Sequence, residues 1–223
     1  MFWYNKKMAY RKNKVRRTWS NDFAYVIGII ATDGNLSSDL RHINITSKDY
    51  EMIANCKKCL NLQNKIGKKA RGGSVEKKYY VLQFGDKNFF EFLLELGLTP
   101  KKSKTIGKLK IPEIYFQHFF RGCIDGDGSI SISTHPESKY LQYKVRLCSA
   151  SKNFLDWILE LSHKHFNIKG GSISKKDKSS VYVLRFGKED SIKILRMIYS
   201  KNVLCLSRKR NIALRILGKP GEW

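Results

Sequence analysis

The chain has 223 residues, of which 42% are hydrophobic, so it is long enough to bury the core of one domain or of two smaller ones. Its 43 lysines and arginines against 19 aspartates and glutamates give a net charge of +24, which argues against a basic partner and indicates a polyanionic one such as nucleic acid. No apolar run reaches the length of a membrane span or resembles a secretory signal, so we expect no membrane partner.

Residues 1–19 form a basic, aromatic N-terminal extension, and an apolar helical run follows it. That run starts at Ser20 or Asn21, which suit a helix cap, and ends at Asp33 before Gly34. Alternating stretches after it predict a hairpin, a helix and a second hairpin. Their inward positions are apolar, namely Ile43, Ile45, Tyr80, Leu82 and Phe84. Their outward positions are His42, Asn44, Thr46, Tyr79, Val81 and Gln83.

The second half of the chain repeats this order. Its first helix starts at Pro112, a favoured first-turn residue, and ends at Asp127 before Gly128. Residues 79–86 are echoed by residues 181–188, and the period is about 100 residues, which is typical of a duplicated domain. Helix, hairpin, helix, hairpin and helix in each half predict an α+β fold with a pseudo-two-fold axis. Each of its two antiparallel sheets should pack one apolar face on helices and leave the other face free.

The free faces and the basic turns beside them carry residue types that suit base edges and phosphates. A single residue of this kind is most often solvated surface, but a repeated stripe on so basic a chain indicates binding to nucleic acid. The candidate DNA-binding residues are Asn44, Thr46, Lys68, Arg71, Gln83, Ser131, Ser133, Gln142, Lys144, Arg146, Lys175, Lys176 and Arg185.

Small residues recur every four positions in the first helix of each half, and this spacing lets two helix backbones approach closely. They are Ala24, Gly28 and Thr32 in the first helix. The corresponding positions of the second helix are His118, Gly122 and Gly126, of which the two glycines are small. Close packing would bring Asp33 and Asp127 together at two helix C-termini, where the helix dipoles and mutual repulsion disfavour carboxylates. A divalent cation such as Mg²⁺ would relieve both penalties and could serve phosphodiester hydrolysis. Asp125 has Ala31 as its counterpart, so we expect a structural role for it.

These helices resemble the signature of the LAGLIDADG homing endonucleases. The nine residues Val26–Gly34 and Phe120–Gly128 correspond to it, and the second copy, with Ile124-Asp-Gly-Asp-Gly128, is the more faithful. The first copy has Ala31 in place of the first acid of the signature, but it keeps the later acid. The surrounding duplication extends from about residue 20 to residue 217.

The resemblance implies a monomeric enzyme with repeats at 20–109 and 110–217, a tail at 218–223, and saddle-shaped sheets that straddle double-stranded DNA. It implies cleavage of both strands at a long, near-asymmetric site with short 3′ overhangs. By analogy with the family, Asp33 and Asp127 would bind Mg²⁺ with the carbonyls of Thr32 and Gly126, and Mn²⁺ or Ca²⁺ could substitute for binding. The family also uses a basic residue in each half and a polar residue near the active-site water. The candidates for the basic residue are Lys102 or Lys104 in the first half and Arg208, Lys209 or Arg210 in the second, and we assign Lys104 and Lys209. The candidates for the polar residue are Ser47 and Ser151.

Two other functions fit the same fold, an intron RNA maturase and a DNA-binding regulator without catalysis. Both metal-binding acids are present, which favours the nuclease. The chain ends lack the residues that protein splicing needs, so we expect a free-standing enzyme encoded within an intron. Five cysteines without a second C-x-x-C pair indicate reduced thiols and an intracellular protein, of the cytoplasm or nucleoid or of an organelle matrix.

Overall fold

The computed structural model describes residues 14–70 and 75–218, so Arg71, most of the N-terminal extension and the last five residues lie outside the described part. In the first half, its elements are α1 (Asn21–Asp33), β1 (Gly34–Leu36), β2 (His42–Ser47), α2 (Tyr50–Cys59), β3 (Ile66–Lys69), β4 (Tyr79–Gly85), α3 (Lys87–Glu95) and the 3₁₀ turn η1 (Lys102–Lys104). In the second half they are the 3₁₀ turn η2 (Glu113–Tyr115), α4 (Phe116–Asp127), β5 (Gly128–Thr134), β6 (Leu141–Ser149), α5 (Lys152–Phe166), β7 (Ser172–Lys175), β8 (Tyr182–Phe186), α6 (Lys188–Ile198) and α7 (Ser207–Leu217). None of the described helices is long and apolar enough to cross a membrane.

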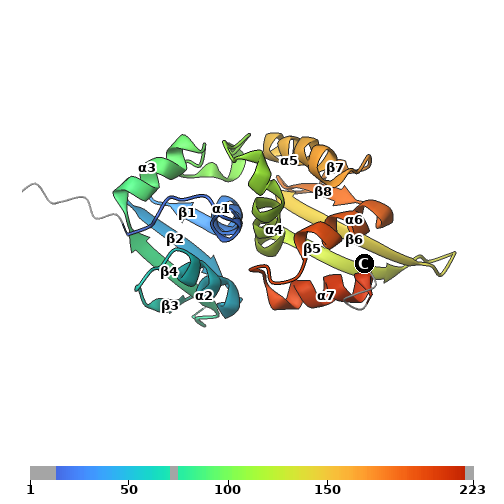
Figure 1. Ribbon diagram of the computed structural model, residues 1–223, viewed down its shortest axis with the longest axis horizontal. Helices are drawn as coiled ribbons and strands as arrows, with labels where there is room; N and C mark the ends of the chain where they lie inside the picture. Colours follow the sequence, from blue (N-terminus) through green and yellow to red (C-terminus); the bar gives the residue numbers. More distant parts are fainter. Residues whose placement is uncertain (1–13, 71–74, 219–223) are drawn as a thin grey trace, which may run out of the picture.

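The strands form two four-stranded antiparallel sheets with the same order, β1-β2-β4-β3 and β5-β6-β8-β7. The predicted duplicated α+β fold is therefore confirmed. Helices α1 and α4 lie side by side at the centre of the molecule, with one sheet beyond each of them (Figure 1). Ser20 caps α1 by accepting a hydrogen bond from the Phe23 N–H at 3.1 Å.

The halves differ from the prediction at two places. The helix expected from Pro112 begins with the turn η2, and α4 starts only at Phe116. The last helix, α7, has only η1 as its counterpart in the first half. Gly107 and Pro112 follow η1 and disfavour a longer helix there, whereas 207–217 contains neither glycine nor proline before Gly218.

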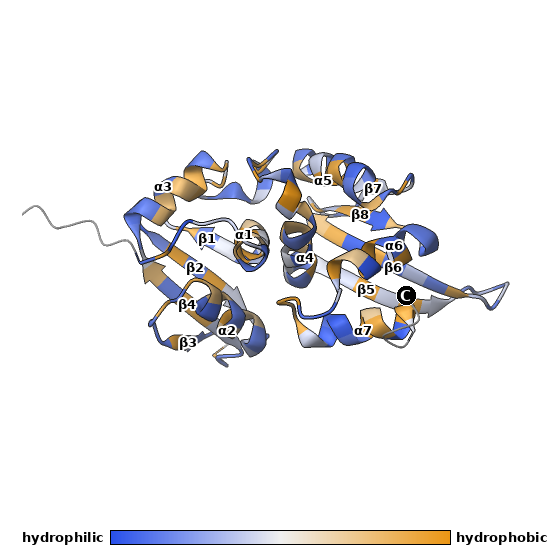
Figure 2. Ribbon diagram, viewed as in Figure 1, coloured by the Kyte–Doolittle hydropathy of each residue, from blue (hydrophilic) through white to orange (hydrophobic). Residues whose placement is uncertain are grey.

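The sheet faces follow the predicted alternation. Ile43, Ile45, Leu82, Phe84 and Val145 are buried beneath the helices. Polar residues occupy the alternate positions on β2 and on the β5–β6 ladder, where Ser129, Ser131 and Ser133 pair with Arg146, Lys144 and Gln142. The same alternation between hydrophilic and hydrophobic residues is seen along the strands, while α1 is mostly hydrophobic (Figure 2). We refer below to the two faces without helices as the open faces.

The two halves are also joined outside α1 and α4. Arg208 at the start of α7 donates two hydrogen bonds to Asp49, the residue before α2, at 2.9 and 2.8 Å. Asn55 of α2 donates to the carbonyl of Cys205 at 3.2 Å. In the other direction, the Ser151 hydroxyl donates to the carbonyl of Ile106 at 2.5 Å. The first half therefore holds the segment around the start of α7, and the second half holds the connection that follows η1.

The contact between α1 and α4 depends on two glycines. A Cβ at Gly28 would lie 2.1 Å from the Phe119 carbonyl oxygen, and one at Gly122 would lie 2.1 Å from that of Tyr25. The two glycine Cα atoms face each other, since a Cβ on either would lie 3.0 Å from the Cα of the other. The stripe of small residues thus brings the two backbones into direct contact.

We predict that Gly28→Ala destabilises the protein by about 1–3 kcal/mol, because the helices must separate to admit the methyl group. In an uncrowded helix the same change would stabilise by about 1 kcal/mol, so the sign of the effect is informative. Urea unfolding followed by circular dichroism measures it. Gly107→Ala is the control, since a Cβ there meets nothing within 4 Å. Equal stability of Gly28→Ala and the wild type would contradict the close contact.

Candidate functional site

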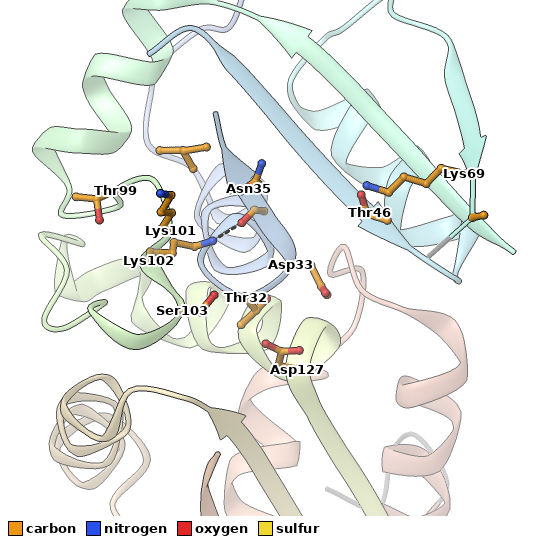
Figure 3. Close-up of a pocket in the computed structure, with 13 residues that line it drawn as sticks. Thr32, Asp33, Asn35, Thr46, Lys69, Thr99, Lys101, Lys102, Ser103 and Asp127 are labelled. Carbon is orange, nitrogen blue, oxygen red and sulfur yellow. Dashed lines mark hydrogen bonds between the residues drawn. The ribbon is translucent and has the colours of Figure 1, made fainter. Parts of the chain in front are cut away.

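The two predicted metal-binding acids are the last residues of α1 and α4. Asp33 and Asp127 line one pocket of about 530 Å³ together with Thr32 and Lys102. The acids lie near each other at the adjoining helix ends, with Lys102 on one side and Lys69 across the pocket on the sheet (Figure 3). Two carboxylates at two helix C-termini concentrate negative charge at this point.

Each acid is followed by a glycine because the chain turns back over the helix that has just ended. A Cβ at Gly34 would lie 2.5 Å from the Ile30 carbonyl oxygen, and one at Gly128 would lie 2.6 Å from that of Ile124. Their φ angles of −79° and −90° are open to any residue. These glycines are therefore required because the chain passes close to the preceding helix turn, not because the backbone is left-handed. Strands β1 and β5 consequently begin directly after the acids.

Gly126 leaves the space in which the Asp33 side chain lies. A Cβ at Gly126 would be 3.0 Å from Asp33 Oδ2 and 2.1 Å from Thr32 Oγ1. The Thr32 hydroxyl donates to carbonyls of its own helix, those of Gly28 and Ile29, each at 3.1 Å. The acid of one repeat thus rests against the backbone of the other.

This donor set fits a hard divalent cation. Mg²⁺ is commonly held by one or two carboxylates and completes its shell with water and substrate phosphates. Residues 14–70 and 75–218 contain no cluster of three His, Cys, Asp or Glu side chains that could hold a metal by itself. A cation here would therefore depend on the two carboxylates, nearby backbone carbonyls, water and substrate.

A buried lysine lies beside the end of each central helix. Lys102, at the start of η1, donates to the carbonyl of Gly34. Lys209 of α7 donates to the equivalent carbonyl of Gly128 at 2.8 Å, and to those of Ile124 and Asp125 at 2.6 and 2.8 Å. Burial lowers the pKa of each lysine to about 8, against the opposing effect of nearby carboxylates.

These contacts change one assignment made from the sequence. Lys104 is exposed and does not line the pocket, whereas Lys102 does. Lys102 and Lys209 are equivalent because they donate to the carbonyls of equivalent glycines, Gly34 and Gly128. A loose repeat of basic residues in the sequence cannot reveal these contacts. Lys209 itself lies at the end of α4, where its charge faces the negative end of the helix.

Asp125 is buried and accepts three hydrogen bonds. They come from the hydroxyls of Tyr25 and Tyr199 at 3.0 and 2.5 Å and from the Leu206 N–H at 2.7 Å. Burial raises the pKa of this carboxyl despite the three donors. Asp125 thereby ties α1, the end of α6 and the start of α7 to α4, which is a structural role, as expected.

The two serines of the predicted repeat are not equivalent. Ser47 ends β2 opposite Tyr80, and the residue in the same place of the second sheet is Ser149, opposite Tyr182. Ser149 lines a small pocket beside Asp127. Ser151 is buried instead, caps α5 and donates to Ile106, so it does not face the site. The sequence comparison was two residues out of register here.

Most of the predicted DNA-binding residues lie on the open faces, but two lysines do not. Lys68 pairs with Tyr80 and Lys175 with Tyr182, on the side that the helices cover. Their neighbours Lys69 and Lys176 lie opposite Tyr79 and Val181, which are open-face positions of the paired segments. Asn35, opposite Asn44 on the open face, was also missed. The open-face positions keep Asn44, Thr46, Gln83, Ser131, Ser133, Gln142, Lys144, Arg146 and Arg185.

Comparison with known proteins shows the same fold elsewhere. Residues 117–199 match the family model of the LAGLIDADG-like domain. Full-length DUF199/WhiA from Thermatoga maritima has a TM-score of 0.56 at 17% identity, over 91% of this chain and 62% of that one, so this chain spans less than two thirds of that protein. Mesophilic variants of the homing endonuclease I-DmoI have a TM-score of 0.56 at 16% identity, over 84% of this chain and 96% of that one. I-DmoI in complex with DNA and Mn has a TM-score of 0.54 at 17% identity, over 82% of this chain and 98% of that one. No curated protein matches in sequence at a significant level.

We predict that Lys102→Met flattens the pH dependence of stability in alkaline solution. The folded protein holds Lys102 with a pKa of about 8, below the ordinary 10.5, so the unfolded chain binds more protons between these values. The free energy of unfolding of the wild type therefore gains from Lys102 as pH rises from 8 to 10.5. Removing Lys102 should lower the slope by up to about 1.4 kcal/mol per pH unit.

Urea unfolding between pH 8 and pH 10, in EDTA, measures this slope. Lys104→Met, at the exposed position two residues along, controls for the loss of a lysine. A slope in Lys102→Met equal to that of the wild type would show that Lys102 is not held as a buried ammonium group.

Proposed function

We propose that this chain, a two-repeat member of the LAGLIDADG family, is a site-specific DNA endonuclease that cuts both strands of a long, near-asymmetric target with a divalent metal and leaves short 3′ overhangs. The observation that supports this most strongly is the placement of Asp33 and Asp127 in one pocket, at the ends of two helices in backbone contact. We assign the repeats to residues 20–109 and 110–217 of a monomer that acts on double-stranded DNA.

The surfaces around the pocket suit a duplex. Thr46 and Lys69 of the first open face line the pocket itself. On the second open face, Arg146 and Arg185 lie opposite each other on neighbouring strands. These side chains offer charge to phosphates and donors to base edges, and they continue outward from the acids on both sheets.

The two aspartates would hold the cation, with Thr32 and Gly126 contributing carbonyls. Bound Mg²⁺ would supply charge stabilisation at the scissile phosphate and an acidified water. I-DmoI has been solved in complex with DNA and Mn, in complex with DNA and Ca, and as a variant with its target DNA in the presence of Mg, which is consistent with a cation of this class. Lys102 lines the pocket near both acids and would place positive charge beside a bound phosphate. Lys209 would act indirectly, because its ammonium group holds the last turn of α4 and thus Asp127.

Replacing either acid tests the proposal. A plasmid that carries the gene's own insertion locus without the intron should be linearised by the wild type in Mg²⁺ and left intact in EDTA. Asp33→Asn and Asp127→Asn should each slow cleavage by at least about 100-fold, because a lost metal ligand removes several kcal/mol of transition-state stabilisation. Agarose gels of a time course measure the rates.

Asp156→Asn is the matched control. Asp156 is an exposed acid of α5 that forms an ion pair with Lys152, one helix turn earlier, so its variant should cut at the wild-type rate. A wild type that binds this DNA without cutting it in any divalent metal would favour a DNA-binding regulator. Tight binding of intron RNA together with intact DNA would favour a maturase.

Paired lysines test which sheet faces meet DNA. Lys69→Ala and Lys176→Ala, on the open faces, should weaken binding to all sequences and lower the slope of log affinity against log salt by about one each. Lys68→Ala and Lys175→Ala, one residue earlier and on the opposite face, should have a smaller effect. Fluorescence anisotropy at several salt concentrations measures both quantities. Equal losses within each pair would contradict the facing of β3 and β7.

A further inference from the structure

The outer hairpins of the two sheets differ in length. In the first sheet, β1 and β2 form three register pairs, from Gly34–Ile45 to Leu36–Ile43. In the second sheet, β5 and β6 form seven, from Gly128–Leu147 to Thr134–Leu141, a difference of four. One more backbone hydrogen bond extends each ladder, from Ser37 N to His42 O and from His135 N to Tyr140 O. Both ladders start at the glycine beside the site, so the extra length lies at the far end.

The extra length projects beyond the four-stranded sheet. Strand β2 begins at His42, opposite Gly85 at the end of β4. Strand β6 runs further, because its pairing with β8 stops at Val145–Phe186 and residues 141–144 pair with β5 alone. We call residues 131–144 the outer ribbon. It extends from the end of the molecule away from α4 (Figure 1).

The outer ribbon presents polar groups and exposed apolar groups together. Its open face continues the row of Ser131, Ser133, Gln142 and Lys144. At its end Tyr140 is 72% exposed, and the next residue, Leu141, is 48% exposed and belongs to the opposite face. The exposed ring of Tyr140 therefore stands at the outer end of the polar row, on the open-face side of the ribbon.

We infer that the second repeat reads a half-site about four base pairs longer than that of the first repeat, because its outer ribbon continues further along the DNA. This inference rests on the proposed function. The major groove is about 12 Å wide and admits a two-stranded ribbon. Four additional pairs at about 3.4 Å each extend the ladder by about 14 Å, which is the length of about four base pairs.

The occupant of the surface is duplex DNA because the ribbon continues the open face beside the acids. Ser, Gln and Lys side chains can bond base edges or phosphates, and Tyr140 can contact a thymine methyl group on the groove floor. The ribbon contains no candidate metal ligand of the site, so it would affect recognition and leave the chemistry unchanged.

The test is selection of bound duplexes from a random-sequence library in Ca²⁺, with the full chain as wild type and as variants. Bound sequences from the wild type should show base preference that reaches about four base pairs further from the centre on one side. A shortened variant lacks Ser133, Thr134, Leu141 and Gln142, which removes two pairs and keeps the alternation of faces. Its preference should retreat by about two base pairs on the longer side only.

Tyr140→Ala gives a second measurement that does not depend on a rebuilt hairpin. It should weaken binding of the full selected duplex several-fold and leave unchanged the binding of a duplex trimmed by the four outer base pairs. Ile114→Ala is the control, since Ile114 is 79% exposed and belongs to η2, not to the ribbon. Equal reach on both sides in the wild type, or an unchanged reach in the shortened variant, would overturn the inference while the nuclease proposal stands. Failure to select any duplex would overturn both.

Discussion

The contact between the backbones of α1 and α4 is the constraint on which the rest of the molecule depends. Gly28 and Gly122 allow the helices to touch, and Gly126 leaves the space beside Asp33. Since both acids are the last residues of these helices, their separation is set by two backbones and not by flexible side chains. The sheets begin at the next residue on each side, so the same contact also fixes where the open faces lie relative to the acids.

Polar contacts that differ between the halves hold this central pair in place. Asp125 joins Tyr25, Tyr199 and Leu206 in one buried cluster, whereas its counterpart Ala31 can make no such bonds. Nearby, the buried Arg121 donates to the carbonyls of Leu204 and Ile198 at 2.8 and 3.2 Å. These bonds fix the segment before α7, and α7 carries the lysine that caps α4. The second repeat is therefore built around charges that the first repeat does without.

The sequence was sufficient for features that depend on local patterns and insufficient for those that depend on tertiary contacts. Alternation along β2 and β6 predicted the faces of both sheets, and the signature helices predicted Asp33 and Asp127 at their ends. Lys68 and Lys175 were misplaced because the turns were treated as one basic group, although pairing with Tyr80 and Tyr182 decides which lysine faces outward. The choice between Lys102 and Lys104 depends on a carbonyl 68 residues away, that of Gly34, and no spacing encodes it.

The surroundings of the two acids are unequal even though their positions are related. The pocket on the side of the first repeat is large and lined by Thr99, Lys101, Lys102 and Ser103. The pocket beside Cys148 and Ser149 of the second repeat is about 60 Å³, and Thr32, Lys102 and Ser103 of the first repeat line it too. Lys102 bonds one backbone carbonyl, whereas Lys209 is enclosed by several. Under the proposed function, a duplex lying across the two open faces would thus meet different polar groups on its two strands. The duplicated helices fix where the acids stand, whereas the residues that line the large pocket belong, apart from Asp127, to the first repeat.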